Sequence, residues 1–420
     1  MSTLKVNKIR DTAGSADSIT LDPNGGAVLA GVTTMTTARV TSGIVTNTFI
    51  VGAGVTISES GIEASGIGIT CANINGTQIG GRRNIVINGA MNVAQRSTSE
   101  TGLGAAAGYF TLDRYRTTFS NTAGRLTMAQ VADVHDGFAN AMKFTCTTAD
   151  TSIGSNEYFI LQQKFEGQDL QQLQKGSSDA KEFTVSFYVK GNASATYVVE
   201  MYDLDNNRQV GKTFSVTTSW TRVVLTFPAD TTGALDDDNA ASLQLGIWLH
   251  AGSDYTSGTL ATSWISNVSA QRAGGITSFF DSTDRTFFLT GLQLEIGSQA
   301  TPFEHRSFGE ELALCQRYYY KLAGDDTTIA TGHQNGAYGI FPIRYPQDMR
   351  AQPTGTAQNV TDAYSYYYEG TVARVASVNL ASHNNRHGNI ESTSYSTTNG
   401  TVGLFRITNS SAYIDISAEL

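Results

Sequence analysis

Proline, cysteine and charge are all scarce in this sequence. The 420 residues include 6 prolines and 3 cysteines, and charged residues make up 15% of the chain, below the roughly 25% of an average soluble protein. Cys71, Cys146 and Cys315 are odd in number and far apart, so they match neither a disulfide framework nor the spacing of metal ligands. The simplest expectation is a chain that folds in a reducing cytosol without a metal or another cofactor.

An excess of positive charge is also missing. The 28 basic residues against 37 acidic ones give a net charge of −9, whereas binding to nucleic acid requires a basic stripe that displaces counterions from phosphates. No apolar run reaches the roughly 20 residues that cross a bilayer. The opening "MSTLKVNKIRDTAGS" also lacks the apolar core of a signal peptide. We therefore expect neither nucleic acid binding nor membrane insertion.

Glycine and small hydroxyl residues are plentiful. The chain has 42 glycines, and Ser and Thr recur throughout, a composition that favours twisted strands joined by tight turns. We predict a mostly β protein in three parts, residues 1–83, 84–305 and 306–420.

The first part, residues 1–83, has too few long apolar side chains for a core of its own. "VTSGIVTNTFIVGAGVTISESGIEASGIGIT" places single Val or Ile residues between Gly, Ser and Thr. Such a segment is either disordered or an intertwined β-fibre in which copies of the chain complete each other's core. The β-branched content favours the fibre, because disordered segments usually hold more charge and proline.

The central part has the alternation of strands with one buried face. "KEFTVSFYVKG" puts every second residue from Phe183 to Val189 on one side, and "SLQLGIWLHAG" does the same from Leu243 to Leu249. Short strands of this kind, separated by turns, predict an antiparallel jelly roll or β-sandwich.

The last part begins with a helical pattern, "GEELALCQRYYYK". Ser307 and Glu310 have the spacing of a capping box, and Leu312, Cys315 and Tyr319 would share one helical stripe. Strand patterns follow up to the end of the chain. We predict a smaller β-sandwich with one short helix, and we expect the helix to seal the end of that sandwich.

Catalytic patterns are weak. The acidic clusters Asp203–Asp205, Asp236–Asp238 and Asp325–Asp326 adjoin Gly or Asn, so solvated turns are the simplest interpretation. "HNNRH" places His383 and His387 four apart, but its turn composition favours a loop over a metal site. With no G-x-S-x-G elbow either, we expect no enzymatic activity.

Aromatic side chains point instead to sugar binding, because the apolar faces of sugar rings stack on exposed aromatic rings. "DAYSYYYEG" would place three tyrosines on one side of a strand and one on the other. The candidate glycan-binding residues are Tyr364, Tyr366, Tyr367, Tyr368 and Trp248. The alternative is that these tyrosines pack inside the domain or at a trimer interface, and that the tryptophans belong to the jelly-roll core.

One passage also resembles a known protein family. "LTGLQLEIGSQATPFEHR" followed by "ELALCQRYYYK" closely resembles a joint in many bacteriophage tail fibre and receptor-binding proteins, where a carbohydrate-binding-module-like jelly roll meets a distal domain. "NIVINGAMNVAQRST", "YFTLDRYR" and "FPIRYPQDMRAQPTGTA" are similar to passages of the same proteins, and the first 15 residues resemble the start of marine-phage fibres. The resemblance covers most of residues 84–358. "RYPQDMR" departs from it by extra residues, and the last sixty residues resemble no known family.

This resemblance implies a component of the virion. The protein would be a non-enzymatic, homotrimeric tail fibre, made in the cytoplasm of the bacterial host. Residues 1–83 would attach to a tail or adaptor protein, and the distal domains would bind host polysaccharide or lipopolysaccharide. Two alternatives remain open: a tailspike-like polysaccharide depolymerase, and a purely structural collar or adaptor fibre.

Overall fold

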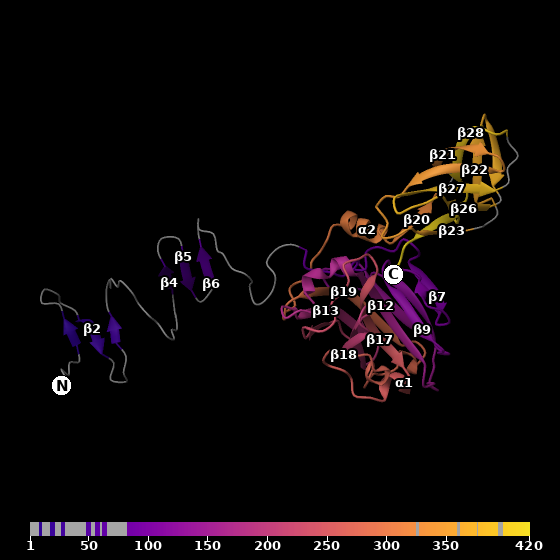
Figure 1. Cartoon of the computed structure of the whole chain (residues 1–420). Helices are drawn as coiled ribbons and strands as arrows, with labels where there is room; N and C mark the ends of the chain where they lie inside the picture. Colours follow the sequence, from indigo (N-terminus) through magenta and orange to yellow (C-terminus); the bar gives the residue numbers. More distant parts are fainter. Residues whose placement is uncertain are drawn as a thin grey trace. The chain divides into compact units, whose positions relative to one another are not determined.

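The chain forms two compact units, residues 1–71 and 72–420, shown in the computed structural model of Figure 1. The structure describes the following residues: 8–10, 17–21, 27–29, 48–51, 55–58, 61–64, 82–324, 327–358, 362–375, 377–393 and 398–420. Within these residues the protein is mostly β, as predicted, with antiparallel sheets and two short α-helices. No helix in the described part of the chain is long and apolar enough to span a bilayer.

The first unit contains two small antiparallel sheets, each of three short consecutive strands. The strands are β1 (Lys8–Arg10), β2 (Asp17–Leu21), β3 (Ala27–Leu29), β4 (Thr48–Val51), β5 (Val55–Ser58) and β6 (Gly61–Ala64). The strand propensity expected from the sequence is confirmed at these positions. Most of residues 1–83 lie outside the described residues, so the intertwining of copies stays a prediction.

Two antiparallel sheets form the jelly roll. One has six strands in the order β16-β13-β19-β11-β10-β7, and the other has seven in the order β18-β15-β14-β17-β12-β9-β8. The strands of the first are β7 (Ser99–Leu103), β10 (Arg125–Val131), β11 (Ala141–Thr148), β13 (Phe183–Gly191), β16 (Thr221–Phe227) and β19 (Thr286–Ile296). Those of the second are β8 (Gly108–Tyr109), β9 (Arg116–Ser120), β12 (Tyr158–Glu166), β14 (Ala195–Asp203), β15 (Arg208–Val216), β17 (Ala241–Ala251) and β18 (Ile265–Ser266). Helix α1 (Ser253–Thr256) follows β17, and short 3-10 turns occupy Gly167–Asp169, Gln171–Leu173, Ser269–Gln271 and Phe279–Asp281.

The core of the jelly roll lies between these sheets, and the predicted alternation is confirmed. Alternate residues from Phe183 to Val189 on β13 and from Leu243 to Leu249 on β17 are buried in a single apolar cluster. Phe187 meets Phe214 of the opposite sheet edge to face, with ring centroids 5.0 Å apart. Aromatic pairs of this geometry add stability beyond their buried area.

The chain after residue 305 forms a second, smaller sandwich with its own core, which we call the distal sandwich. Helix α2 (Phe308–Gln316) opens it. A three-stranded sheet contains β20 (Tyr319–Ala323), β29 (Tyr413–Ser417) and β23 (Thr354–Ala357), in that order. A seven-stranded sheet contains β25 (Thr371–Val375), β24 (Tyr364–Tyr368), β28 (Val402–Ile407), β21 (Thr327–Asn335), β22 (Tyr338–Arg344), β27 (His387–Thr393) and β26 (Ser377–Ala381), in that order. Its apolar core shares no buried residue with that of the jelly roll.

Helix α2 has the predicted capping box, but it ends before Tyr319. Ser307 and Glu310 bond reciprocally at its first turn. The helix ends at Gln316, and Tyr319 begins β20 by pairing with Ser417 of β29, so the prediction that Tyr319 lies on the helical stripe is wrong. We expected α2 to seal the distal sandwich. Its buried Glu311 accepts a hydrogen bond from the backbone N–H of Asn88 in the jelly roll (2.5 Å), so the helix also contacts the jelly roll.

A buried carboxylate holds the two sandwiches together. The side chain of Glu166, at the end of β12, is fully buried and accepts hydrogen bonds from Arg317 Nε (2.8 Å), Arg317 Nη2 (2.6 Å) and the Tyr318 hydroxyl (2.5 Å). Burial alone would raise the pKa of Glu166, but these hydrogen bonds and the charge of Arg317 lower it below its ordinary value. Glu166 is therefore ionised and paired across the joint.

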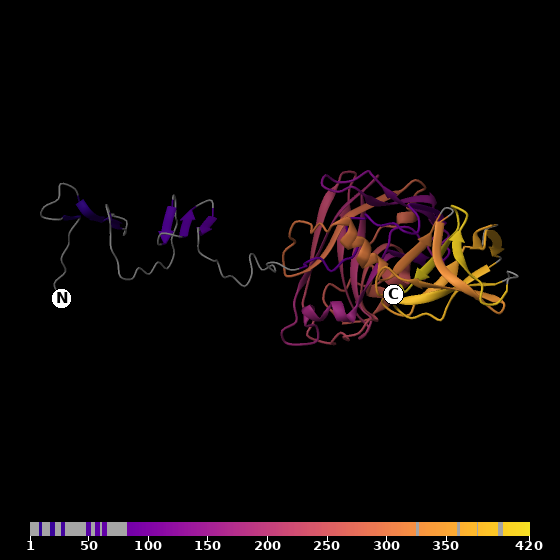
Figure 2. The same ribbon diagram turned by 90° about the horizontal axis from the view of Figure 1, so that it is seen from above.

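The C-terminus forms a second attachment to the jelly roll. Glu419 pairs with the buried Arg114, and with Arg96 at 3.1 Å, while the Tyr109 hydroxyl donates to the backbone carbonyl of Leu420 (2.8 Å). In both views the C-terminus lies where the distal sandwich meets the jelly roll (Figure 1 and Figure 2). The distal sandwich is thus attached at both its first and its last residues.

The first prediction concerns this joint. Replacing Glu166 by Gln leaves the size unchanged but removes the charge that Arg317 and Tyr318 bond to, so we expect the free energy of unfolding to fall by about 3 kcal/mol. Urea unfolding followed by circular dichroism would measure it. The matched control is Asp133→Asn, because Asp133 pairs with Lys190 (2.6 Å) on the surface, where loss of an ion pair costs less than about 1 kcal/mol. Equal effects of the two substitutions would contradict the role given to Glu166.

The second prediction concerns pH. Burial raises the pKa of Asp113, beside the joint, from 3.8 to about 6, against the opposing influence of Arg96 and Gln95. The folded state therefore holds this proton more tightly than the unfolded chain, and the stability it contributes at low pH is lost as pH rises from about 4 to about 6. We expect the melting temperature of Asp113→Asn, relative to that of the unsubstituted protein, to rise over this interval and to stay level above it. A difference that is constant from pH 4 to pH 7 would refute the assignment.

Candidate binding site

Two of the tyrosines predicted to bind a glycan are buried in the structure. Tyr364 and Tyr366 of β24 are 1% and 0% exposed and belong to the core of the distal sandwich. Their hydroxyls donate to the backbone carbonyls of Tyr413 and Thr401, both at 2.8 Å. A buried ring cannot stack on a sugar, so the prediction of a binding role is corrected for these two, and the alternative of internal packing holds.

Tyr367 and Tyr368 lie on opposite faces of the same strand. The ring of Tyr368 is partly buried against the core. Tyr367 is 38% exposed and pairs with the exposed Val372 on the neighbouring strand. A sugar-binding role for Tyr367 stays a prediction.

A cleft of about 220 Å³ lies on the outer face of the seven-stranded sheet of the jelly roll, away from its core. It is lined by Tyr158, Ile160 and Gln162 of β12, Gln244 and Trp248 of β17, Tyr202 of β14, and by Leu204, Tyr255 and Arg272 from the loops and α1. The strand register explains why these residues gather. Gly246 of β17 sits opposite both Gln162 and Glu200, so β12, β14 and β17 bring their lining residues together at the same level of the sheet.

Aromatic rings form one wall of the cleft. Trp248 lies 5.8 Å from Tyr158 and 5.3 Å from Tyr255, and these two tyrosines are 5.3 Å apart (centroid to centroid). Tyr158, Tyr202 and Tyr255 are half-buried, whereas Trp248 is fully buried. The predicted residue Trp248 is therefore part of the cleft as its floor, and the tyrosines supply the accessible rings.

An ion pair fixes the polar part of the cleft. The carboxylate of Glu200, which is 1% exposed, accepts hydrogen bonds from Arg272 Nε and Nη2 (both 2.7 Å) and from Trp248 Nε1 (2.9 Å). The Arg272 guanidinium lies over the rings of Tyr202 (4.5 Å) and Trp248 (4.9 Å). Burial alone would lower the pKa of Arg272, but Glu200 raises it. The pair has no net charge and holds the rings in fixed orientations.

The tyrosine and glutamine side chains supply neutral hydrogen-bonding groups. Burial raises the pKa of both Tyr202 and Tyr255, so their hydroxyls stay protonated at neutral pH. Gln162 accepts a hydrogen bond from the Thr118 hydroxyl (2.8 Å) through its Oε1 atom, which leaves its amide N–H groups as donors. The cleft thus combines ring faces with uncharged donors and acceptors.

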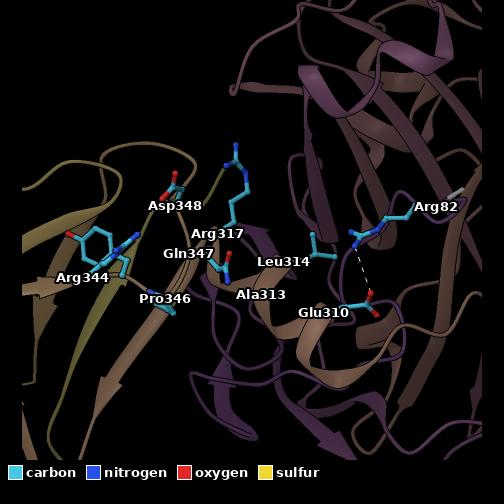
Figure 3. Close-up of a pocket in the computed structure, with 10 residues that line it drawn as sticks. Arg82, Glu310, Ala313, Leu314, Arg317, Arg344, Pro346, Gln347 and Asp348 are labelled. Carbon is cyan, nitrogen blue, oxygen red and sulfur yellow. Dashed lines mark ion pairs between the residues drawn. The ribbon is translucent and has the colours of Figure 1, made fainter.

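A larger recess, of about 590 Å³, lies between α2 and the end of β22, and Figure 3 shows its residues. Two of its three arginines are engaged, since Arg82 pairs with Glu310 (4.0 Å) and Arg317 with Glu166. Its one aromatic lining residue, Tyr345, is 4% exposed. The recess therefore offers no ring for stacking.

A second group of aromatic side chains lies on the outer face of the six-stranded sheet. His135 stacks on Tyr188 with centroids 4.0 Å apart, and Phe138 meets Tyr188 and Phe303 at 5.5 Å and 5.1 Å. These rings lie against one another, and Phe138 and Phe303 are half-buried. This patch is the natural comparison for the cleft.

The acidic clusters follow the predicted pattern in part. Asp205 and residues Asp236–Asp238 are exposed in turns, as expected. Asp203 is fully buried, contrary to the prediction, because Lys175 pairs with it and with Asp230 (3.0 Å) inside the jelly roll. Asp325 and Asp326 lie outside the described residues.

Of the residues that line the cleft, the sequence analysis named only Trp248 as a candidate. A signal existed on β14, because Glu200 and Tyr202 interrupt a strongly apolar strand on the face opposite the core. No comparable signal marks Tyr255 of α1 or Arg272, since the positions of both depend on how the segment after β17 folds.

No protein-family model matches the chain, and no curated protein matches it. Solved structures that match include carbohydrate-binding modules. They include TmCBM61 in complex with β-1,4-galactotriose (11% identity, 51% of this chain, 99% of that chain, TM-score 0.27), the xylan-binding domain CBM22-1 from Paenibacillus barcinonensis Xyn10C (13%, 44%, 87%, 0.23) and the family 11 module of Lic26A-Cel5E of Clostridium thermocellum (13%, 50%, 99%, 0.24). TM-scores this low decide nothing about function, which must be inferred from the residues of this chain.

Proposed function

We propose that this protein is a non-catalytic, homotrimeric bacteriophage tail fibre that binds a glycan of the host surface, polysaccharide or lipopolysaccharide, through its jelly roll. Residues 1–83 attach it to a tail or adaptor protein of the virion. The observation that carries the binding role is the cleft with three accessible tyrosines on the outer face of the seven-stranded sheet. The tail fibre assignment is supported by the resemblance of the passage around α2.

The chemistry of the cleft suits a neutral, hydroxyl-rich ligand. Tyrosine rings stack on the apolar faces of sugar rings, and amides and hydroxyls bond the sugar hydroxyls. Because Glu200 neutralises Arg272, the cleft has no free positive charge for a phosphate or carboxylate. We therefore infer that it binds an uncharged segment of the glycan.

The joint suits a fibre that transmits force. A ligand in the cleft contacts β12, whose outward positions lead from Tyr158 to Glu166, over roughly 27 Å at about 3.4 Å per residue. Glu166 in turn pairs with Arg317 of the distal sandwich. Strand β12 thus connects the proposed glycan-binding cleft directly to the joint with the distal sandwich.

The third prediction tests the cleft. In full-length protein, we expect Tyr202→Ala to weaken binding to purified host polysaccharide about tenfold, because one lost stacking contact costs about 1.4 kcal/mol. Isothermal titration calorimetry would measure the dissociation constant.

The matched control is Tyr188→Ala, on the opposite face of the same jelly roll, which should bind as the unsubstituted protein does. Weakening by Tyr188→Ala alone would move the site to the other sheet and contradict the proposal. If new reducing ends form while the protein is incubated with the polysaccharide, the protein cleaves its ligand, and the proposal of a non-catalytic fibre is contradicted in favour of a depolymerase.

The fourth prediction concerns assembly. Residues 1–83 lack the apolar side chains for a core of their own, so we expect full-length protein to be a trimer. Size-exclusion chromatography with light scattering should give a mass of three times 44.9 kDa. A monodisperse monomer would contradict the fibre, whatever the outcome for the cleft.

A further inference from the structure

Three side chains with metal-binding groups meet close to the start of α1 in the jelly roll. Asp150 follows β11, Glu157 immediately precedes β12, and His250 is the second-last residue of β17. The backbone carbonyl of Glu157 accepts a hydrogen bond from the N–H of Gly252 (2.8 Å), directly before α1. Segments far apart in the sequence therefore converge on this cluster.

The distances within the cluster match a shared ion. One ligand atom from each of Asp150, Glu157 and His250 lies within 4.8 Å of the others. Two ligands at about 2.0–2.2 Å from a tetrahedral zinc ion lie roughly 3.5 Å apart, so side-chain shifts of about 1 Å would bring the three groups to bonding distance of one ion and leave the fourth position open. The three residues are 5%, 9% and 0% exposed, so the position is enclosed.

Hydrogen bonds hold the far side of two of these groups. Asp150 Oδ2 accepts from the Thr122 hydroxyl (2.8 Å) and from the Ala123 N–H (2.7 Å). His250 Nδ1 contacts the Ser278 hydroxyl oxygen (2.8 Å), while its other ring nitrogen lies 3.4 Å from Glu157 Oε2. Hydrogen bonds that orient the ligating side chains in this way are typical of metal sites.

The cluster also lacks a compensating cation. Among the described residues, no Lys or Arg lies within ion-pair distance of Asp150 or Glu157, and their one cationic candidate is His250 itself. Buried carboxylates are normally paired with a cation or coordinate a metal. The buried ion pairs elsewhere in this jelly roll, such as Glu200 with Arg272, follow that rule.

We propose that Asp150, Glu157 and His250 bind a divalent first-row transition-metal ion, for which Zn²⁺ is the probe. One imidazole and two carboxylates suit zinc better than calcium, which prefers oxygen ligands alone. The ion ties β12 and β17 together at the ends next to Tyr158 and Trp248, so it stabilises one wall of the cleft. The proposal of a metal site does not depend on whether the cleft binds a glycan.

The fifth prediction tests this site by metal content. Full-length protein without an affinity tag is freed of metal with a chelator, dialysed to equilibrium against micromolar Zn²⁺, and analysed by mass spectrometry. We expect about one Zn²⁺ per chain, and about a tenfold lower content in His250→Gln and Asp150→Asn. Zinc should also raise the melting temperature of the unsubstituted protein by several degrees and leave these variants unchanged.

The matched control is His135→Gln, a half-buried histidine on the other sheet, which should retain the full zinc content. If His250→Gln fails to fold, Glu157→Gln replaces it, because that carboxylate lies nearest the surface of the three. No bound zinc in the unsubstituted protein would overturn the proposal. Calcium binding that is equal in the unsubstituted protein and in His250→Gln would overturn the choice of metal.

Discussion

The buried charge of Glu166 sets the relation between the two sandwiches. Its carboxylate has no solvent to stabilise it, so it depends on Arg317 and Tyr318 from the distal side. These two residues follow directly after α2, whose capping box fixes where the helix begins. The short helix therefore places an arginine and a tyrosine opposite one carboxylate. The position of α2 therefore decides whether the buried carboxylate of Glu166 finds its two partners from the distal sandwich.

Strand β12 connects this joint to the cleft on the outer face of the seven-stranded sheet. Its outward side chains form the cleft near Tyr158 and reach the joint at Glu166, while its inward side chains fill the core. Alternation along a strand thus allows one segment to fill the core with one face and to line the cleft with the other. Because both sandwiches keep separate cores, the distal one can vary while the cleft stays in place.

The sequence predicted the sandwiches because apolar residues alternate along β13 and β17, a pattern that only a one-sided sheet explains. It also predicted the start of α2 from Ser307 and Glu310. It failed at Tyr364 and Tyr366, because alternation separates two faces of a strand without saying which is buried. Trp248 lines the cleft, but its ring is buried, because Tyr255 of α1 and Arg272 of a later loop lie against it. Such coverage by loops depends on long-range contacts that no local pattern encodes.

The attachment of the last two residues has a practical consequence. The distal sandwich contacts the jelly roll through Arg317 at its start and through Glu419 and Leu420 at its end. Both ends of this segment therefore lie at the joint with the jelly roll. A chimaera that exchanges the distal sandwich must therefore carry over both boundaries, including Glu419 and Leu420.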